Sequence, residues 1–196
     1  MQIDLNKLKK SKLYSEELGI DLKSRKDKEL FKWFLASILF GARISETIAK
    51  RTYKTFKHYR LLTPKSILKA GWDFLVNPIM REGGYVRYDG KTSTQILENC
   101  KTLLEEYNGS LNRLHAEAKD SKDLETRLLS FYGIGPVTVN IFLRELRPFW
   151  KKSNPEPLSI VKKLARKYKI NLSIYKRKSL TFTRIEAGLI RLRKVK

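Results

Sequence analysis

The ten residues 131–140, which read FYGIGPVTVN, constrain the fold of this chain more than any other segment. Gly133 and Gly135 interrupt a helical pattern, Pro136 follows at once, and a new apolar run then begins. Glycine supplies the backbone conformations of a tight reversal, and proline suits the first position of a helix because its missing N–H would have no partner there. The segment therefore predicts a helix, a sharp turn and a second helix whose first N–H groups can bind an anion.

Apolar residues recur at three- and four-residue spacing through most of the chain, as the run Phe31, Phe34, Leu35, Ile38 and Leu39 illustrates. This spacing is typical of helices, and no long segment alternates with the period of a β-strand. The pattern predicts helices over residues 28–56 with a break at Gly41, and over 91–106, 121–130, 137–146, 158–168 and 183–194. Ser45 and Thr63 are expected helix N-caps, and Asn108-Gly109 is an expected helix stop. The fold class is therefore all-α.

The chain carries 42 Lys and Arg against 20 Asp and Glu, a formal charge of +22. Such an excess predicts attraction to polyanions and does not constrain the fold. Residues 144–196 are especially basic, with 17 Lys and Arg and three acidic residues. This stretch is either a solvated basic face or a surface that follows a phosphate backbone, and its place directly after the glycine turn favours the second interpretation.

The length of 196 residues suits one domain, or one domain with two lobes. Cys100 is the single cysteine, expected as buried filler, so a site built on several cysteines is excluded. Residues 1–12 are too polar for a signal peptide, and no apolar run reaches the length of a membrane span. These features predict a cytoplasmic protein in a reducing compartment, and we expect a monomer. Tyr85 and Trp150 are more typical of core or interlobe packing than of contact with a base.

Three segments in this order resemble a known family: residues 34–43 (FLASILFGAR), residues 91–109 ending in Asn-Gly, and the turn at 131–140. They are similar to the helix-hairpin-helix DNA glycosylases of the endonuclease III superfamily, over residues 28–165. The resemblance implies a two-lobed helical fold with double-stranded DNA across the cleft, and base excision repair as the process. It divides the chain into a basic N-terminal arm or helix (1–27), the glycosylase-like core (28–165) and a basic C-terminal helical segment (166–196).

The resemblance also implies which residues contact DNA. Backbone N–H groups of the hairpin would hold one phosphate, and a side chain in place of glycine would keep the backbone away from it. Arg43 lies where the family inserts a wedge into the gap left by a flipped base. The expected DNA-binding residues are Gly133, Ile134, Gly135, Val137, Thr138, Arg43, Arg144, Lys151 and Lys152. The hairpin carbonyls near Gly133 are a candidate site for a monovalent cation.

The chain departs from the family at its two catalytic positions. Val137 stands where bifunctional members carry a lysine nucleophile, so that lyase chemistry is not available. Pro157 stands where the family places an aspartate, which leaves Glu156 as the adjacent acidic residue and candidate catalytic carboxylate. The family's iron–sulfur loop is missing, and no cofactor is expected. The resemblance thus implies a monofunctional DNA glycosylase with water as the nucleophile. Two alternatives stay open: a catalytically inactive DNA-binding or damage-recognition protein on the same scaffold, and a basic RNA-binding or ribosome-linked helical protein.

Overall fold

The computed structural model describes residues 4–193 of the chain, and within this range the protein is helical without any β-strand. The expected all-α class is confirmed. The α-helices are α1 (Leu5–Lys9), α2 (Tyr14–Glu17), α3 (Asp27–Gly41), α4 (Glu46–His58), α5 (Pro64–Phe74), α6 (Arg81–Gly83), α7 (Asp89–Tyr107), α8 (Leu111–Glu117), α9 (Ser121–Leu129), α10 (Pro136–Leu146), α11 (Ser159–Lys167) and α12 (Leu180–Leu192). Two 3-10 helices, η1 (Leu22–Ser24) and η3 (Leu172–Ile174), and a π-helix, η2 (Leu75–Met80), complete the described elements. None of the helices in this range is long and apolar enough to cross a membrane.

Local chemistry sets several helix ends where the sequence predicts them. The Ser45 hydroxyl accepts the Ile48 N–H at 3.2 Å, and the Thr63 hydroxyl accepts the Ser66 N–H at 3.1 Å, so both residues are N-caps. Asn108 ends α7 in the left-handed conformation, with φ of 52°. The three expected boundaries are confirmed because each depends on contacts between neighbours in the sequence.

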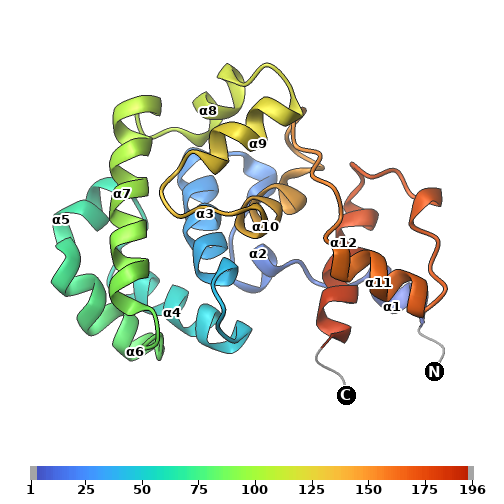
Figure 1. Ribbon diagram of the computed structural model, residues 1–196, viewed down its shortest axis with the longest axis horizontal. Helices are drawn as coiled ribbons and strands as arrows, with labels where there is room; N and C mark the ends of the chain where they lie inside the picture. The colour runs from blue at the N-terminus through green and yellow to red at the C-terminus, as the bar shows by residue number, and fades with distance from the viewer. Residues whose placement is uncertain (1–3, 194–196) are drawn as a thin grey trace.

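Helices α3 and α10 pack together at the centre of the molecule, with α4 to α7 on one side and α1, α11 and α12 on the other (Figure 1). The main hydrophobic core surrounds this central pair. The Trp33 indole is fully buried and donates a hydrogen bond to the Phe142 carbonyl at 3.0 Å, which fixes α3 against α10. Tyr85 and Cys100 belong to the same core, as expected.

A second, smaller hydrophobic cluster joins the two ends of the described chain. It consists of Leu8 from α1, residues of α11 and α12, and no residue of the central pair: Leu8, Val161, Leu164, Ala165, Ile185 and Leu189. The grouping differs from the expected segments, since α11 packs with α12 and α1 instead of with the core over residues 28–165. The N-terminal segment expected as a basic arm or helix forms the short helices α1, α2 and η1, and Leu13 to Leu22 contribute buried side chains to the main core. Apolar side chains on one face of each short helix require a partner helix, and these segments find theirs far away in the sequence.

The loop after α10 is held by buried polar contacts. Arg147 is fully buried, forms an ion pair with Glu186 of α12, and donates to the Pro155 carbonyl. Trp150 packs in the main core, and its ring stacks on that of His115 at 4.5 Å. Lys152 donates to the carbonyls of His115 and Ala116, both at 2.9 Å, at the C-terminus of α8. The loop is therefore a fixed part of the fold.

At Gly41, helix α3 lies close against Thr138 of α10. A Cβ atom at this position would lie 2.0 Å from the Thr138 hydroxyl oxygen, whereas a Cβ at Gly135 would meet no atom within 4 Å. Replacement of Gly41 by valine should therefore lower the free energy of unfolding by about 1–3 kcal/mol through overpacking. Gly135→Val is the matched control, because φ at Gly135 is −104° and valine adopts this conformation without strain. Denaturant titrations of both variants test this. Equal stability of the two would contradict the close packing.

His115 predicts a pH dependence of stability. Burial, followed by the charges of Lys152 and Lys178, lowers the pKa of His115 from 6.5 to about 4. The unfolded chain binds the proton more readily than the folded one, so the free energy of unfolding should fall as pH drops from about 6.5 to about 4. His115→Phe keeps the stacking on Trp150 and should flatten this part of the curve. NMR titration of the His115 ring measures the pKa directly, and a midpoint near 6.5 would contradict the assignment.

Candidate functional site

The turn between α9 and α10 has the geometry that its two glycines predict. Gly133 has φ of 68°, in the left-handed region that favours glycine. Gly135 is the N-cap of α10, and Pro136 takes the first helical position. Two side chains of α7 bind the backbone of the turn. The Gln95 amide donates to the Gly133 carbonyl at 2.9 Å, and the Asn99 amide donates to the Tyr132 carbonyl at 3.2 Å.

The N-terminus of α10 is open to a ligand. The first N–H groups of any helix lack acceptors within the helix and carry the positive end of its dipole. The side of Gly135 on which a side chain would project is empty, and Val137 is 49% exposed. The expected phosphate-binding groups therefore lie at an accessible surface. Ile134 is an exception, because its side chain is buried in the core and contributes to packing.

A hollow of about 310 Å³ lies beside this turn, and we call it the turn groove. Its lining residues come from α3, the α3–α4 connection, α7 and the residue before it, the turn and α10: Ile38, Gly41, Ala42, Arg43, Tyr88, Lys91, Thr92, Gln95, Gly133 and Thr138. The fold thus brings together three expected DNA-binding residues, Arg43, Gly133 and Thr138. It adds Lys91, a cation that the sequence did not single out.

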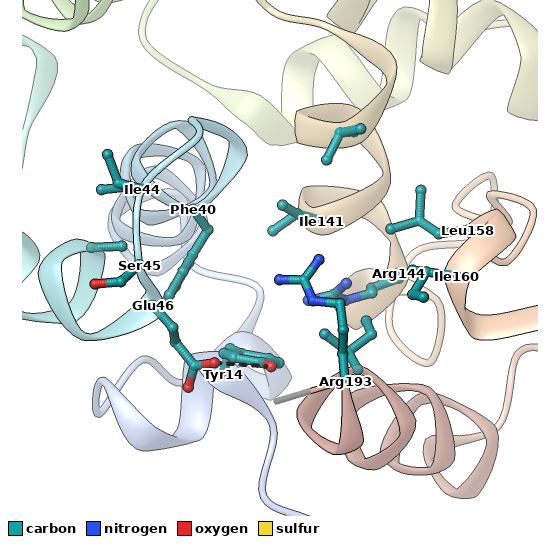
Figure 2. Close-up of a pocket in the computed structure, with 13 residues that line it drawn as sticks. Tyr14, Phe40, Ile44, Ser45, Glu46, Ile141, Arg144, Leu158, Ile160 and Arg193 are labelled. Atoms are coloured by element: carbon teal, nitrogen blue, oxygen red, sulfur yellow. Dashed lines mark hydrogen bonds between the residues drawn. The ribbon is translucent and has the colours of Figure 1, made fainter. Parts of the chain in front are cut away.

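A second hollow, the cleft pocket, lies on the other side of the α3–α4 connection (Figure 2). It holds about 170 Å³, more than about ten times the space that one water molecule requires. Its lining residues come from α2, α3, α4, α10, α12 and the residues at the start of α11: Tyr14, Phe40, Ile44, Ser45, Glu46, Ala49, Val137, Ile141, Arg144, Leu158, Ile160, Ile190 and Arg193. Neighbouring residues face different hollows, since Arg43 and Thr138 line the turn groove while Ile44 and Val137 line the cleft pocket.

Glu46 contributes the carboxylate of the cleft pocket from the first turn of α4. Its carboxylate pairs with Lys50 at 2.5 Å and accepts a hydrogen bond from the Tyr14 hydroxyl at 3.4 Å. Burial opposes the charge of Lys50, but hydrogen bonds to Glu17 and Glu46 raise its pKa above the usual value. Burial, followed by the charge of Glu46, raises the pKa of Tyr14 to about 12. Tyr14 therefore stays a hydrogen-bond donor at neutral pH.

Tyr14 is held in the pocket by a buried carboxylate from the opposite helix. Both Glu145 oxygens accept backbone N–H groups at the start of α2, from Tyr14 and from Ser15, each at 3.0 Å. Burial raises the pKa of Glu145, although the charge of Arg144 and these hydrogen bonds oppose the shift. A carboxylate capping a helix N-terminus is a favourable arrangement, so α10 determines where the Tyr14 ring lies.

Glu156, the expected catalytic carboxylate, lies outside the cleft pocket. Its side chain is 64% exposed and pairs with Arg177 and, at 3.2 Å, with Lys162. The hydrogen bond from Arg177 outweighs the effect of burial, and with the Lys162 hydrogen bond it lowers the pKa of this carboxyl. The Glu156 backbone carbonyl accepts the amide of Asn140 in α10 at 2.6 Å. Glu156 instead lines a separate hollow together with Lys162 and Arg177.

Of the other residues expected to contact DNA or a cation, some line a hollow and others are engaged within the fold. Arg144 lines the cleft pocket and is only 4% exposed. Lys152 uses its ammonium group on the carbonyls at the end of α8, and Lys151 is an exposed residue of the same loop. The Gly133 carbonyl, expected as a cation ligand, already accepts the Gln95 amide. Within residues 4–193 there is no group of three His, Cys, Asp or Glu side chains arranged to hold a metal ion.

The sequence pattern did not identify Tyr14 or Glu46. The sequence contains only a weak indication of Glu46, namely that it follows the Ser45 N-cap and so begins a helix directly after the Arg43 segment. It contains no indication of Tyr14, since only the long-range contact with Glu145 brings it to the site.

Comparison of the chain with protein-family models, curated proteins and solved structures found no match.

Proposed function

We propose that this protein binds double-stranded DNA at the turn groove and takes one base into the cleft pocket, where it hydrolyses the N-glycosidic bond of that base. The observation that carries the proposal is the pair of hollows on either side of the α3–α4 connection. One offers backbone N–H groups and cations, and the other is a partly open hollow lined by apolar and charged side chains. Duplex DNA presents the matching features, namely phosphates on its surface and a base that can rotate out of the stack.

Phosphate binding is supported by the chemistry of the turn groove. The N-terminus of α10 favours an anion, and Arg43 and Lys91 line the same hollow. Gly135 lets a phosphate oxygen approach the backbone, because no atom of the protein lies within 4 Å of the position that a side chain would take. The overall charge of +22 favours the approach of a polyanion.

The α3–α4 connection is suited to enter the gap in the duplex. It separates the two hollows, and Arg43 stands at their boundary next to Ile44, which lines the cleft pocket. A side chain placed there would fill the space left by the extrahelical base, which lowers the cost of unstacking.

Glu46 supports the hydrolytic step better than Glu156 does. Glu46 lines the cleft pocket at its edge, and its carboxylate forms an ion pair with Lys50. In the proposed reaction water attacks the sugar carbon, the bond to the base nitrogen breaks, and its electron pair leaves with the base. Glu46 accepts the proton from water, and the developing positive charge on the sugar is stabilised by the carboxylate.

A second function is supported by a specific contact, namely the pairing of Glu46 with Lys50. A carboxylate that is neutralised in this way has less capacity to stabilise a cationic transition state. On this alternative the scaffold recognises an extrahelical base in DNA without cleaving it.

Excision distinguishes the two functions. Duplexes that each carry one lesion or mismatch are incubated with protein and then treated with alkali, which cleaves the strand at an abasic site. We expect wild-type protein to produce alkali-dependent cleavage, Glu46→Gln to lose it by at least about 100-fold, and Glu156→Gln, the matched control, to retain it.

Each other result has a defined meaning. Loss of excision in Glu156→Gln with retention in Glu46→Gln would reverse the assignment of the carboxylate. Tight binding without cleavage of any duplex would support the recognition protein, and preference for structured RNA over duplex DNA would contradict both functions.

Binding at the turn is tested by Gly135→Val, which leaves the fold unstrained. The added side chain should keep a phosphate away from the α10 N-terminus and weaken duplex binding by about 10-fold or more. Arg43→Gln should weaken binding to all sequences and reduce the slope of log K against log salt by about 1. Fluorescence anisotropy across a salt series measures both effects. Unchanged affinity in Gly135→Val, or an affinity of the wild type that does not depend on salt, would contradict the proposed interface.

A further inference from the structure

Arg144 carries a buried charge whose partners within the fold are incomplete. The side chain is 4% exposed, and its Nε atom has no hydrogen-bond partner. Among residues 4–193, Arg144 forms no ion pair within 4.0 Å. Its guanidinium lies 5.3 Å from the centre of the Tyr14 ring, a contact that stabilises a cation only in part. A buried cation without a full set of partners is costly, and a ligand with hydrogen-bond acceptors would remove that cost.

The charges around the cleft pocket favour an acceptor-rich ligand. Arg144 and Arg193 both project toward the middle of the pocket in Figure 2, whereas Glu46 points toward Tyr14 at its edge. The Glu46 carboxylate is engaged by Lys50 and Tyr14, and the Glu145 carboxylate is engaged by backbone N–H groups. Arg191 also lies over the Tyr14 ring, at 4.2 Å, and pairs with Glu17. The cations Arg144 and Arg193 thus project into the middle of the pocket, whereas the Glu46 carboxylate lies at its edge (Figure 2).

Arg144 lies on the face of α10 that lines the cleft pocket, where the proposed function places an extrahelical base. Val137, Ile141 and Arg144 line the pocket from the same face of α10, and Arg144 follows Val137 by two helical turns, about 10 Å along the axis. A phosphate bound at the N-terminus of α10 would place its own nucleotide along this face, with the base toward Arg144 and the apolar side chains against the base plane.

We infer that Arg144 restricts the cleft pocket to neutral or acidic bases with carbonyl and ring-nitrogen acceptors, and excludes cationic alkylated purines. This inference rests on the proposed function, because it assumes that an extrahelical base enters the pocket. An arginine pairs in bidentate fashion with adjacent acceptors such as O6 and N7 of a purine. An N7-alkylated purine has lost the N7 acceptor and carries a positive charge, which Arg144 repels. Hypoxanthine, a deaminated purine that is neutral and keeps both the O6 and N7 acceptors, represents the substrate class that Arg144 accepts.

Binding measurements test the inference independently of catalysis. Two duplexes carry hypoxanthine or N7-methylguanine opposite cytosine, and each modified nucleotide has a 2′-fluoro sugar that resists glycosidic cleavage. A third duplex carries guanine at this position as the reference. Wild-type protein should bind the hypoxanthine duplex at least about fivefold more tightly than the N7-methylguanine duplex.

The variants separate the charge from the shape of the side chain. Arg144→Met should remove the preference between the two modified duplexes, whereas Arg144→Lys, which keeps the charge, should retain weak binding of N7-methylguanine. Arg43→Gln is the control, because it should weaken all three duplexes equally. Thermal unfolding of each variant shows whether it folds, and if Arg144→Met does not, the wild-type and Arg144→Lys preferences decide.

The results also distinguish this inference from the proposed function. Equal binding of both modified duplexes by the wild type, or an unchanged preference in Arg144→Met, would overturn the role of Arg144 while leaving DNA binding intact. Failure of the wild type to bind any of the three duplexes would overturn the proposed function and the inference with it.

Discussion

The burial of three charged side chains at the C-terminal end of α10 is the constraint on which the rest of the structure depends. Glu145 caps α2, Arg147 pairs with Glu186 of α12, and Arg144 lies against Tyr14 in the cleft pocket. Desolvation alone would make each of these charges unfavourable, so each must find a partner from another element. Removal of one partner of such a buried pair typically costs about 3–5 kcal/mol. Helix α10 therefore determines where α2, α12 and the loop after α10 lie.

The same helix couples the two hollows. Consecutive residues of a helix point in different directions, so Val137 lines the cleft pocket while Thr138 lines the turn groove. Thr138 also contacts Gly41 closely, which fixes the start of the α3–α4 connection against α10. On the proposed function, the groups that hold the DNA backbone and those that receive the base thus belong to one rigid unit. A shift of α10 would change both kinds of contact at once.

The arrangement of charge explains why one acidic residue suits the proposed chemistry and another does not. Glu156 stands in the loop ahead of α11, where Arg177 and Lys162 draw its carboxylate to the surface. Glu46 begins α4 and lies at the edge of the cleft pocket, where Tyr14 and Lys50 hold its carboxylate. The local sequence around Glu46 and Glu156 does not show which of the two carboxylates lies beside the pocket. The position of the Glu156 carboxylate, for example, depends on Arg177, which is 21 residues away. The role of Lys152 was likewise not predictable from its neighbours in the sequence, because its ammonium group donates to the His115 carbonyl at the end of α8, 37 residues away.

The sequence by itself determined the helical class, the caps at Ser45 and Thr63, the stop at Asn108 and the glycine turn before Pro136. Each of these depends on contacts between residues within a few positions of one another, which a local pattern records. Only the tertiary structure decided that α1, α11 and α12 form a cluster of their own and that Tyr14 meets Glu145, 131 residues away. Such contacts depend on how apolar faces and buried charges find partners across the whole chain, and no short stretch of sequence specifies that choice.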